Sequence, residues 1–210
     1  MNDGTRLPTE PTGRQAAVAR ATAPVKPLFL TPFAPSYAED ITSWVRDERE
    51  LTWLAPGTVP PLTPEKVVAW GKDRDRRLLL WQPGADEPIG YAELNKMPVY
   101  AAQMWIGHFV LDPRRRGRSL GHCFAAALLA SAFLECAATE VLLVVFPDNR
   151  SAIRCYERSG FQVAGQETKF FKTTQREHLF LRMSITATRF YQMAAAGRLP
   201  GKPLAVHPSP

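Results

Sequence analysis

The stretch that decides the fold of this chain runs Leu111-Asp112-Pro113-Arg114-Arg115-Arg116-Gly117-Arg118-Ser119-Leu120-Gly121. It follows an apolar segment with strand character and leads directly into a long helix rich in Ala and Leu. A Gly- and Arg-rich turn that opens a helix points unpaired backbone N–H groups at one place, and the helix macrodipole adds positive potential there. The pattern predicts a phosphate-binding turn at the carboxyl end of a strand.

A second motif follows that helix and one more apolar strand. It runs Asn149-Arg150-Ser151-Ala152-Ile153-Arg154-Cys155-Tyr156-Glu157-Arg158-Ser159-Gly160-Phe161. Asn149 is suited to cap the helix that this segment forms, and Tyr156 lies two helical turns further along the same face. The two motifs together are more specific than either one alone.

Hydrophobic periodicity and turn residues predict alternating strands and helices over most of the chain. Strands are expected at 28–30, 77–81, 88–94, 104–111, 140–146, 161–164 and 179–185. Helices are expected within 40–54, at 63–70, 120–138 and 149–159, and through Phe190, Tyr191 and Met193. The predicted class is α/β (α+β), with a central mixed sheet of about seven strands flanked by about four helices, and an extra helix near the C-terminal end.

Length and composition indicate one folded domain with tails. The chain has 210 residues, of which 45% are hydrophobic and 22% charged, which is typical of a globular domain. We expect a flexible N-terminal tail at 1–26, the folded domain at 27–186, and a C-terminal helix with a Pro-rich tail at 187–210. No secretory signal is apparent in the first residues, which lack an apolar core.

The net charge of +6 and the sequence pI of about 9.5 favour an acidic partner. Four arginines between Arg114 and Arg118 focus part of this charge on one turn, which favours a local phosphate site. Few aromatic residues are interleaved with these arginines, so a nucleic-acid-binding domain is the weaker reading and no nucleic-acid partner is expected. The most apolar segment, 120–138, contains His122 and Glu135 and predicts a buried helix, so no membrane partner is expected.

The cysteines point to a reducing compartment and not to a metal site. Cys123, Cys136 and Cys155 lack C-x-x-C spacing, and no histidine lies at ligand spacing from them. We therefore expect buried thiols, a cytoplasmic location and no metal.

On these motifs the chain resembles the acyl-CoA-binding core of the GNAT superfamily of N-acetyltransferases. That family shows a strand ending near Val-x-Pro, then Arg-Gly-x-Gly-x-Gly opening a helix, and later Asn-x-x-Ala-x-x-x-Tyr-x-x-x-Gly-Phe. The resemblance is strongest over 105–161, and the order of elements extends it over roughly 28–186. It implies a GNAT-like fold, acetyl-CoA as acyl donor and an amine as acceptor.

The resemblance also implies a cofactor site. Amides of the turn would hold the CoA pyrophosphate, and the strand end with Asn149 and Tyr156 would hold the pantetheine arm. The residues so implied are Phe109, Val110, Leu111, Arg116, Gly117, Arg118, Ser119, Leu120, Gly121, Asn149 and Tyr156, with the Arg114 side chain also available. Ser119 stands where the family usually has glycine: its N–H remains available and its hydroxyl can cap the helix, but its Cβ narrows the approach of a pyrophosphate.

Tyr156 is the expected catalytic acid. A phenol with a reference pKa of about 10 can protonate a departing thiolate with a reference pKa of about 8.5. Outside this motif, a tyrosine on an amphipathic helix is more often a core aromatic. The same holds for the tryptophans of the N-terminal half, which are more often core than pocket.

The general base stays open between two residues. The segment 104–109 has no Asp or Glu where the family often places a carboxylate, which leaves His108 on that strand and Glu93 on the preceding one. His108 can equally be a satisfied core histidine, and Glu93 can equally form a structural salt bridge.

The leading interpretation is an N-acetyltransferase that moves an acetyl group from acetyl-CoA to a primary amine by direct attack in a ternary complex. The alternative is a catalytically idle CoA-binding module of the same fold, which Ser119 and the missing strand carboxylate favour. The acceptor, a small-molecule or peptide amine, is not identified, although a basic chain disfavours polycationic amines. An exposed C-terminal strand and helix would support a homodimer.

Overall fold

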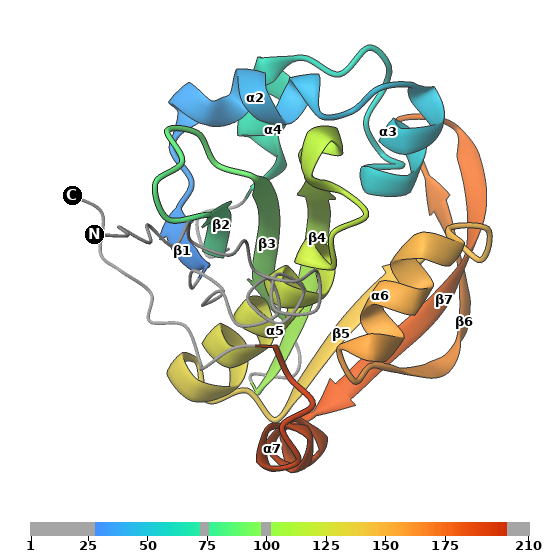
Figure 1. Cartoon of the computed structure of the whole chain (residues 1–210). Helices are drawn as coiled ribbons and strands as arrows, with labels where there is room; N and C mark the ends of the chain where they lie inside the picture. Colours follow the sequence, from blue (N-terminus) through green and yellow to red (C-terminus); the bar gives the residue numbers. More distant parts are fainter. Residues whose placement is uncertain (1–27, 72–75, 98–101, 201–210) are drawn as a thin grey trace, which may run out of the picture.

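The computed structural model describes residues 28–71, 76–97 and 102–200, so the expected tail at 1–26 and the last ten residues lie outside it. Within these ranges, seven strands form one sheet in the order β1-β2-β3-β4-β5-β7-β6 (Figure 1). The strands are β1 (Phe29–Pro32), β2 (Arg76–Trp81), β3 (Gly90–Lys96), β4 (Gln103–Leu111), β5 (Glu140–Val145), β6 (Gln162–Phe171) and β7 (Arg176–Thr186). Only β4 and β5 pair in parallel, which confirms the predicted mixed sheet.

The helices follow the predicted order with two differences. They are α2 (Ala38–Ser43), α3 (Glu48–Leu54), α4 (Pro64–Trp70), α5 (Leu120–Ala130), α6 (Arg150–Arg158) and α7 (Ala187–Ala195). The helical pattern at 40–54 is split, because the side chain of Asp47 accepts a hydrogen bond from the N–H of Glu50 and starts a new helix. The helix expected at 120–138 ends earlier: α5 passes into a π-helical turn, Ser131–Glu135, and the chain reverses at Ala137 with φ of 51°.

Both faces of the sheet are buried. In β2, Leu78 and Leu80 pack into one core cluster, which includes residues of α5, α6 and α7. Leu79 packs into a second cluster with residues of α2 and α4. Because successive side chains of a strand point to opposite faces, the continuous apolar run of β2 is explained by helices on both sides.

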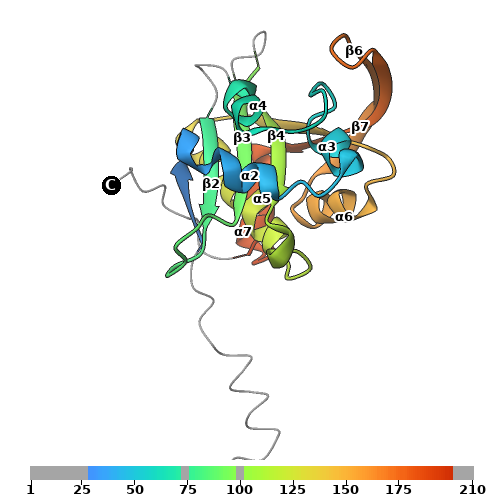
Figure 2. The same cartoon turned by 90° about the horizontal axis from the view of Figure 1, so that it is seen from above.

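The β6–β7 hairpin is longer than the sequence pattern predicted. It extends beyond the rest of the sheet and lies beside α3 in both views (Figures 1 and 2). Hydroxyls of Thr173 and Thr174 in its turn donate hydrogen bonds to the carbonyls of Gly57 and Pro56 in the loop after α3. The hairpin and this loop therefore enclose one end of the molecule together.

The central strands separate before β4 reaches the predicted phosphate-binding turn, residues 112–121, called the phosphate turn below. β4 and β5 pair only from Gln103 to Trp105, and beyond that point they diverge (Figure 1). A β-bulge in β4 sets His108 and Phe109 opposite the single residue Ala92, and His108 takes φ of 44°. A bulge bends the strand that carries it, so this local irregularity opens the sheet.

Within the described ranges, no helix is both long and apolar enough to cross a membrane.

Candidate active site

A cleft of about 760 Å³ opens between the diverging strands. It is lined by β4, by the first turn of α5, by α6, by α3 and by the β6–β7 hairpin. Its volume lies within the usual range of small-molecule and cofactor sites. Of the site residues expected from the sequence, all but Arg118 line this cleft, so the tertiary structure brings the two motifs and the candidate bases together.

The phosphate turn has the free donors that the sequence predicted. The backbone N–H groups of residues 117–122 have no hydrogen-bond acceptor among the described residues, and they lie at the first turn of α5. Two residues of the turn are left-handed: Gly117 has φ of 76° and Ser119 has φ of 59°. These six donors and the helix dipole make an anion-binding corner of the cleft.

Ser119 does not cap the helix, which corrects the expectation from the sequence. It stands at the N-cap position, but its side chain accepts no hydrogen bond from the first turn of α5. A normal N-cap has extended backbone angles, whereas Ser119 is left-handed, so its hydroxyl points elsewhere. The preference of the family for glycine at this position follows from the backbone conformation.

The side chain of Arg116 links the phosphate turn to the N-terminal helices. It donates to Oε1 of Glu50 at 2.7 Å, to the carbonyl of Trp44 at 3.0 Å and to the carbonyl of Leu111 at 3.1 Å. Burial alone would raise the pKa of Glu50, but hydrogen bonds from Arg46 and Arg116 outweigh it and lower that pKa to about 2. This carboxylate on α3 therefore fixes the phosphate turn against the N-terminal helices.

The other arginines of the turn differ in their availability. Arg114 lies 3.0 Å from Oδ2 of Asp112 and 3.5 Å from Oε2 of Glu87, so its charge is already paired. Arg118 is exposed and has no side-chain partner within the described ranges. Of the arginine side chains expected to be available to a pyrophosphate, Arg118 is the one left unpaired.

Gly121 is required by packing as much as by the ligand. A Cβ at this position would lie 3.0 Å from Sγ of Cys155 and 3.6 Å from Cδ1 of Leu111. Glycine therefore lets the first turn of α5 approach both α6 and the end of β4 closely. Helix packing therefore accounts for glycine at this position of the motif. The sequence pattern alone does not distinguish this explanation from a requirement of phosphate binding.

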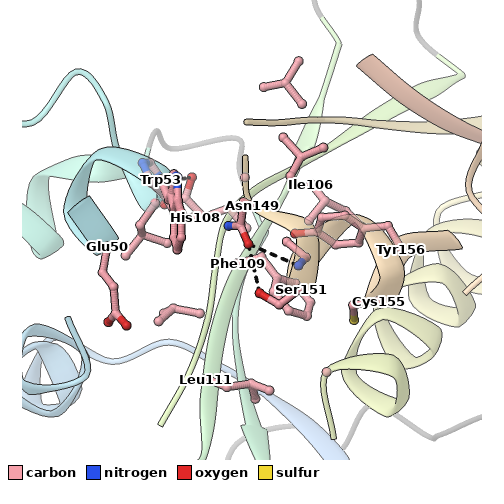
Figure 3. A pocket seen from close by; sticks show the side chains of 18 of the residues that line it. Glu50, Trp53, Ile106, His108, Phe109, Leu111, Asn149, Ser151, Cys155 and Tyr156 are labelled. Atoms are coloured by element: carbon pink, nitrogen blue, oxygen red, sulfur yellow. Dashed lines mark hydrogen bonds and ion pairs between the residues drawn. The ribbon is translucent and has the colours of Figure 1, made fainter. Parts of the chain in front are cut away.

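Asn149 caps α6 as predicted. Its Oδ1 accepts hydrogen bonds from the N–H of Ala152 at 3.2 Å and from the hydroxyl of Ser151 at 3.0 Å (Figure 3). The amide nitrogen of the same side chain makes no hydrogen bond among the described residues, and the residue lines the cleft. One end of this side chain holds the helix, while the other remains a donor for a ligand.

Tyr156 lies on the opposite side of the cleft from His108 and Trp53 (Figure 3). Its ring is 7% exposed and packs edge-on against Phe109 and Phe161, at centroid distances of 5.7 and 5.8 Å. Its hydroxyl has no partner among the described residues. Burial raises the pKa of this phenol above its usual value, so the hydroxyl keeps its proton at neutral pH.

The buried Glu93 and the partly exposed His108 form a pair in the lining of the cleft. Glu93 is 2% exposed, and its Oε2 lies 3.0 Å from Nδ1 of His108. Nδ1 is buried and its N–H direction misses the carboxylate, so the pair interacts through charge when the imidazole is protonated. The ring of His108 stacks on Trp70 at 4.3 Å. The bulge in β4 is what turns this histidine toward Glu93.

Further donors surround the Glu93 carboxylate. The Tyr91 hydroxyl donates to Oε1 of Glu93 at 2.7 Å, and Nε of Arg77 donates to the Tyr91 hydroxyl at 2.8 Å. Asn95 approaches Oε2 at 3.4 Å. Burial would raise the pKa of Glu93, but its interactions with His108, Tyr91 and Asn95 together lower it. Glu93 is therefore ionised at neutral pH despite its burial.

Sequence reasoning missed several residues of the cleft. Glu50 on α3 faces it, and Lys169, Phe171 and Phe180 of the hairpin close its other side. Trp53 on α3, one of the tryptophans that the sequence left open between core and pocket, also lines the cleft. Nothing in the local pattern around these residues indicates a site. Only the packing of the hairpin against the loop after α3 places them there.

One cleft thus holds a helix-opening turn with free backbone amides, a separated pair of parallel strands and a carboxylate–histidine pair. The chain belongs to the acetyltransferase (GNAT) family, whose model matches residues 38–161. The fold and the family predicted from the two motifs are thereby confirmed.

The relatives found by comparison are acetyltransferases of amines. The chain is 30% identical over 83 residues to a spermine/spermidine N(1)-acetyltransferase of Bacillus subtilis, a match that covers 37% of this chain and 55% of that protein. The chain thus spans about half the length of the curated relatives it matches.

Solved structures share the fold at low identity. A spermidine N-acetyltransferase from Vibrio cholerae, in complex with CoA and spermine, superposes with a TM-score of 0.65 at 16% identity, covering 79% of this chain and 98% of that one. An aminoglycoside acetyltransferase in complex with coenzyme A and kanamycin has a TM-score of 0.62 at 20% identity, covering 80% and 99%. These likenesses establish the architecture.

Proposed function

We propose that the protein is an N-acetyltransferase that transfers an acetyl group from acetyl-CoA to a primary amine of a small molecule or peptide by direct attack in a ternary complex. One observation carries the proposal: a single cleft holds free amide donors, a protonated phenol on one side, and on the opposite side a histidine beside an ionised carboxylate (Figure 3). Family membership supports the same activity.

The donor fits the residues that are present. The N–H groups of 117–122 would receive the pyrophosphate, and the exposed Arg118 adds positive charge beside it. The edge of β4 from Ile106 to Leu111, unpaired with β5, offers backbone groups to the amides of the pantetheine arm, and the Asn149 amide adds a donor. Bound there, acetyl-CoA supplies the acetyl thioester, which an amine attacks.

Tyr156 is proposed as the general acid. Its hydroxyl has no hydrogen-bond partner among the described residues, and the residue lines the cleft on the side of α6. The phenol is protonated at neutral pH, because its ordinary pKa of about 10 already lies well above 7 and burial raises that pKa further. It can therefore donate a hydrogen bond or a proton to the sulfur as the thiolate leaves.

His108 and Glu93 are proposed to act together as the base. His108 is partly exposed to the cleft and would take a proton from the acceptor ammonium, directly or through a water. Glu93 is buried behind it and would stabilise the imidazolium that results. The two candidates that the sequence left as alternatives thus become one unit with separate tasks.

Direct attack is favoured over a cysteine intermediate. Cys155 lines the cleft, but burial raises the pKa of its thiol to about 11. A thiol with that pKa is almost fully protonated at neutral pH and is a weak nucleophile.

The test combines binding and turnover. Calorimetric titration with acetyl-CoA is expected to show binding to the wild type, and thiol release is expected with a panel of primary amines. His108→Ala and Glu93→Gln are expected to lower kcat by at least about 100-fold and to keep donor binding. Unchanged pH–rate profiles in both variants would remove the pair from the mechanism.

The alternative of a catalytically idle CoA-binding module rests on Ser119, whose Cβ borders the phosphate turn. It predicts donor binding without thiol release for every amine tried. The same pair of measurements therefore separates the two functions.

Compartment and assembly are also proposals. Three free cysteines support a reducing compartment, and we propose the cytoplasm. Val163, Phe170 and Leu179 expose apolar side chains on the β6–β7 hairpin and support a homodimer, which light scattering of the purified chain would detect. Arg114 pairs with Asp112 and Arg116 pairs with Glu50, so the charges of these two arginines are already compensated within the protein. This supports the proposal that the protein has no nucleic-acid partner.

A further inference from the structure

We propose that the acceptor is a monoamine carried on an apolar body of about aromatic size, and that Lys169 excludes polyamines from the cleft. The inference rests on the proposed acetyl transfer and adds the class of substrate to it. Three features of the acceptor end of the cleft carry it: its aromatic walls, the cations already placed on them, and the pairing of four nearby carboxylates with basic side chains.

The acceptor end is walled by aromatic side chains from three elements. They are Trp53 of α3, Trp105 of β4, and Phe171 and Phe180 of the hairpin. Phe171 and Phe180 pack on each other at a centroid distance of 6.1 Å, and Gly57 of the loop after α3 lies against the ring of Phe171. Rigid aromatic walls gain free energy by removing apolar surface of a ligand from water.

The tryptophan faces that could attract a cationic ligand already carry cations of the protein. Nζ of Lys169 lies 4.6 Å from the ring centroid of Trp105, and the guanidinium of Arg49 lies 4.5 Å from that of Trp53. A cation over an aromatic face uses the attraction that an ammonium ligand would otherwise find there, and it repels a second positive charge. Lys169 lines the cleft, whereas Glu167, which lies 2.7 Å from its Nζ and partly offsets its charge, does not, so a polyamine in the cleft would meet the ammonium side of this pair.

Four carboxylates line this end of the cleft or flank its cations, and each of the four lies within 4.0 Å of a basic side chain of the described residues, so none of them is free for a second ammonium group. Glu50 pairs with Arg46 and Arg116, and Glu93 pairs with His108. The remaining two are Glu167, 2.7 Å from Lys169, and Asp148, 3.1 Å from Arg49. A polyamine would have to leave water with its extra charges uncompensated, and that desolvation is costly.

A monoamine avoids both costs. Its single ammonium loses a proton at the His108–Glu93 pair, and the remainder of the molecule needs only apolar contact. In this respect the cleft departs from relatives that are named for spermine and spermidine. Specificity would be set by the hairpin and α3, outside the two motifs that bind the donor.

The experiment compares 2-phenylethylamine with spermidine in wild type and in a charge-reversed variant. We expect kcat/KM for 2-phenylethylamine to exceed that for spermidine by at least about tenfold. Bringing an uncompensated charge of spermidine out of water into the cleft should lower its kcat/KM by more than this factor. Lys169→Glu should raise kcat/KM for spermidine by about tenfold through the reversed charge next to the ligand. Lys172→Glu, an equal charge change at an exposed residue of the hairpin turn outside the cleft lining, is the matched control and should change neither value.

The possible results test the substrate class and the acetyl transfer separately. Wild-type preference for spermidine, or equal effects of Lys169→Glu and Lys172→Glu, would overturn the substrate class while leaving acetyl transfer intact. Thiol release only with a polar peptide amine would overturn it as well. Absence of thiol release with every amine, with acetyl-CoA still bound, would overturn the proposed function and this inference with it.

Discussion

The left-handed serine of the phosphate turn offers a quantitative test of how the turn is built. Ser119 has φ of 59° and ψ of 7°, and its hydroxyl caps nothing. A left-handed conformation costs a residue with a Cβ about 1–2 kcal/mol. Glycine adopts this conformation without the cost, but its greater conformational entropy in the unfolded chain destabilises the fold by about 0.4–1 kcal/mol. Ser119→Gly should therefore stabilise the fold by a net of about 0.5–1 kcal/mol.

Two measurements check this expectation. For a chain of this size, about 1 kcal/mol corresponds to a rise in Tm of about 2–4 °C, which thermal unfolding resolves. Removal of the Cβ also widens the approach of the pyrophosphate to the free N–H groups. Calorimetry should therefore show acetyl-CoA bound about three- to tenfold more tightly.

Matched variants in the same turn separate backbone from side chain. Gly117→Ala should destabilise by about 1 kcal/mol, because φ is 76° while no atom lies within 4 Å of the added Cβ. Ser119→Ala keeps the Cβ and removes a hydroxyl without a cap contact, so Tm and donor affinity should not change. A loss of stability in Ser119→Gly, or an effect of Ser119→Ala as large as that of glycine, would refute the reasoning.

Three further predictions concern the cleft. Tyr156→Phe should lower kcat by about 100-fold and preserve acetyl-CoA binding, as thiol release and calorimetry would report; an unchanged kcat would contradict the acid role. Gly121→Ala should destabilise by about 1–3 kcal/mol, because its Cβ would lie 3.0 Å from Sγ of Cys155, and adding Cys155→Ala should restore most of the loss. The pKa of Glu50 is lowered from 4.5 to about 2, so the folded state binds fewer protons than the unfolded chain between these values. Its stabilisation is therefore full above about pH 4.5 and lost as pH falls toward 2, and Glu50→Gln should flatten this part of the pH–stability curve in denaturant unfolding.

Much of the fold was predictable because its signals are local. Asn149 caps α6 as expected, and Thr63 caps α4 at the start of the helix expected at 63–70, since a cap involves an N–H only three residues away. Among the expectations that failed, two show how the structure departs from a local pattern. Asp47 starts a second helix inside an otherwise continuous apolar pattern, and Ser119 is held left-handed by the turn instead of capping α5.

The candidate site was predictable only in part. The motifs identified the donor end, and Glu93 and His108 were named as candidates for the base. The distance of 3.0 Å between Nδ1 of His108 and Oε2 of Glu93 depends on the register of β3 with β4 and on the bulge in β4. No local sequence pattern predicts either of these. Glu50 shows the same limit, since its role arises from contact with Arg116, far along the chain.

The sequence by itself determined the mixed α/β fold, the helix-opening turn at 112–121 and the place of Tyr156 on the helix that Asn149 caps, because capping, helical periodicity and left-handed glycine act over a few residues. Only the tertiary structure decided that Arg116 anchors the turn, that Glu93 and His108 form one pair, and that Lys169 and four aromatic side chains surround the acceptor. These depend on strand separation and on the packing of the β6–β7 hairpin against α3. Contacts between segments that are distant in the sequence depend on how all the helices and strands pack around the core. Local sequence patterns extend over only a few residues and therefore do not predict them.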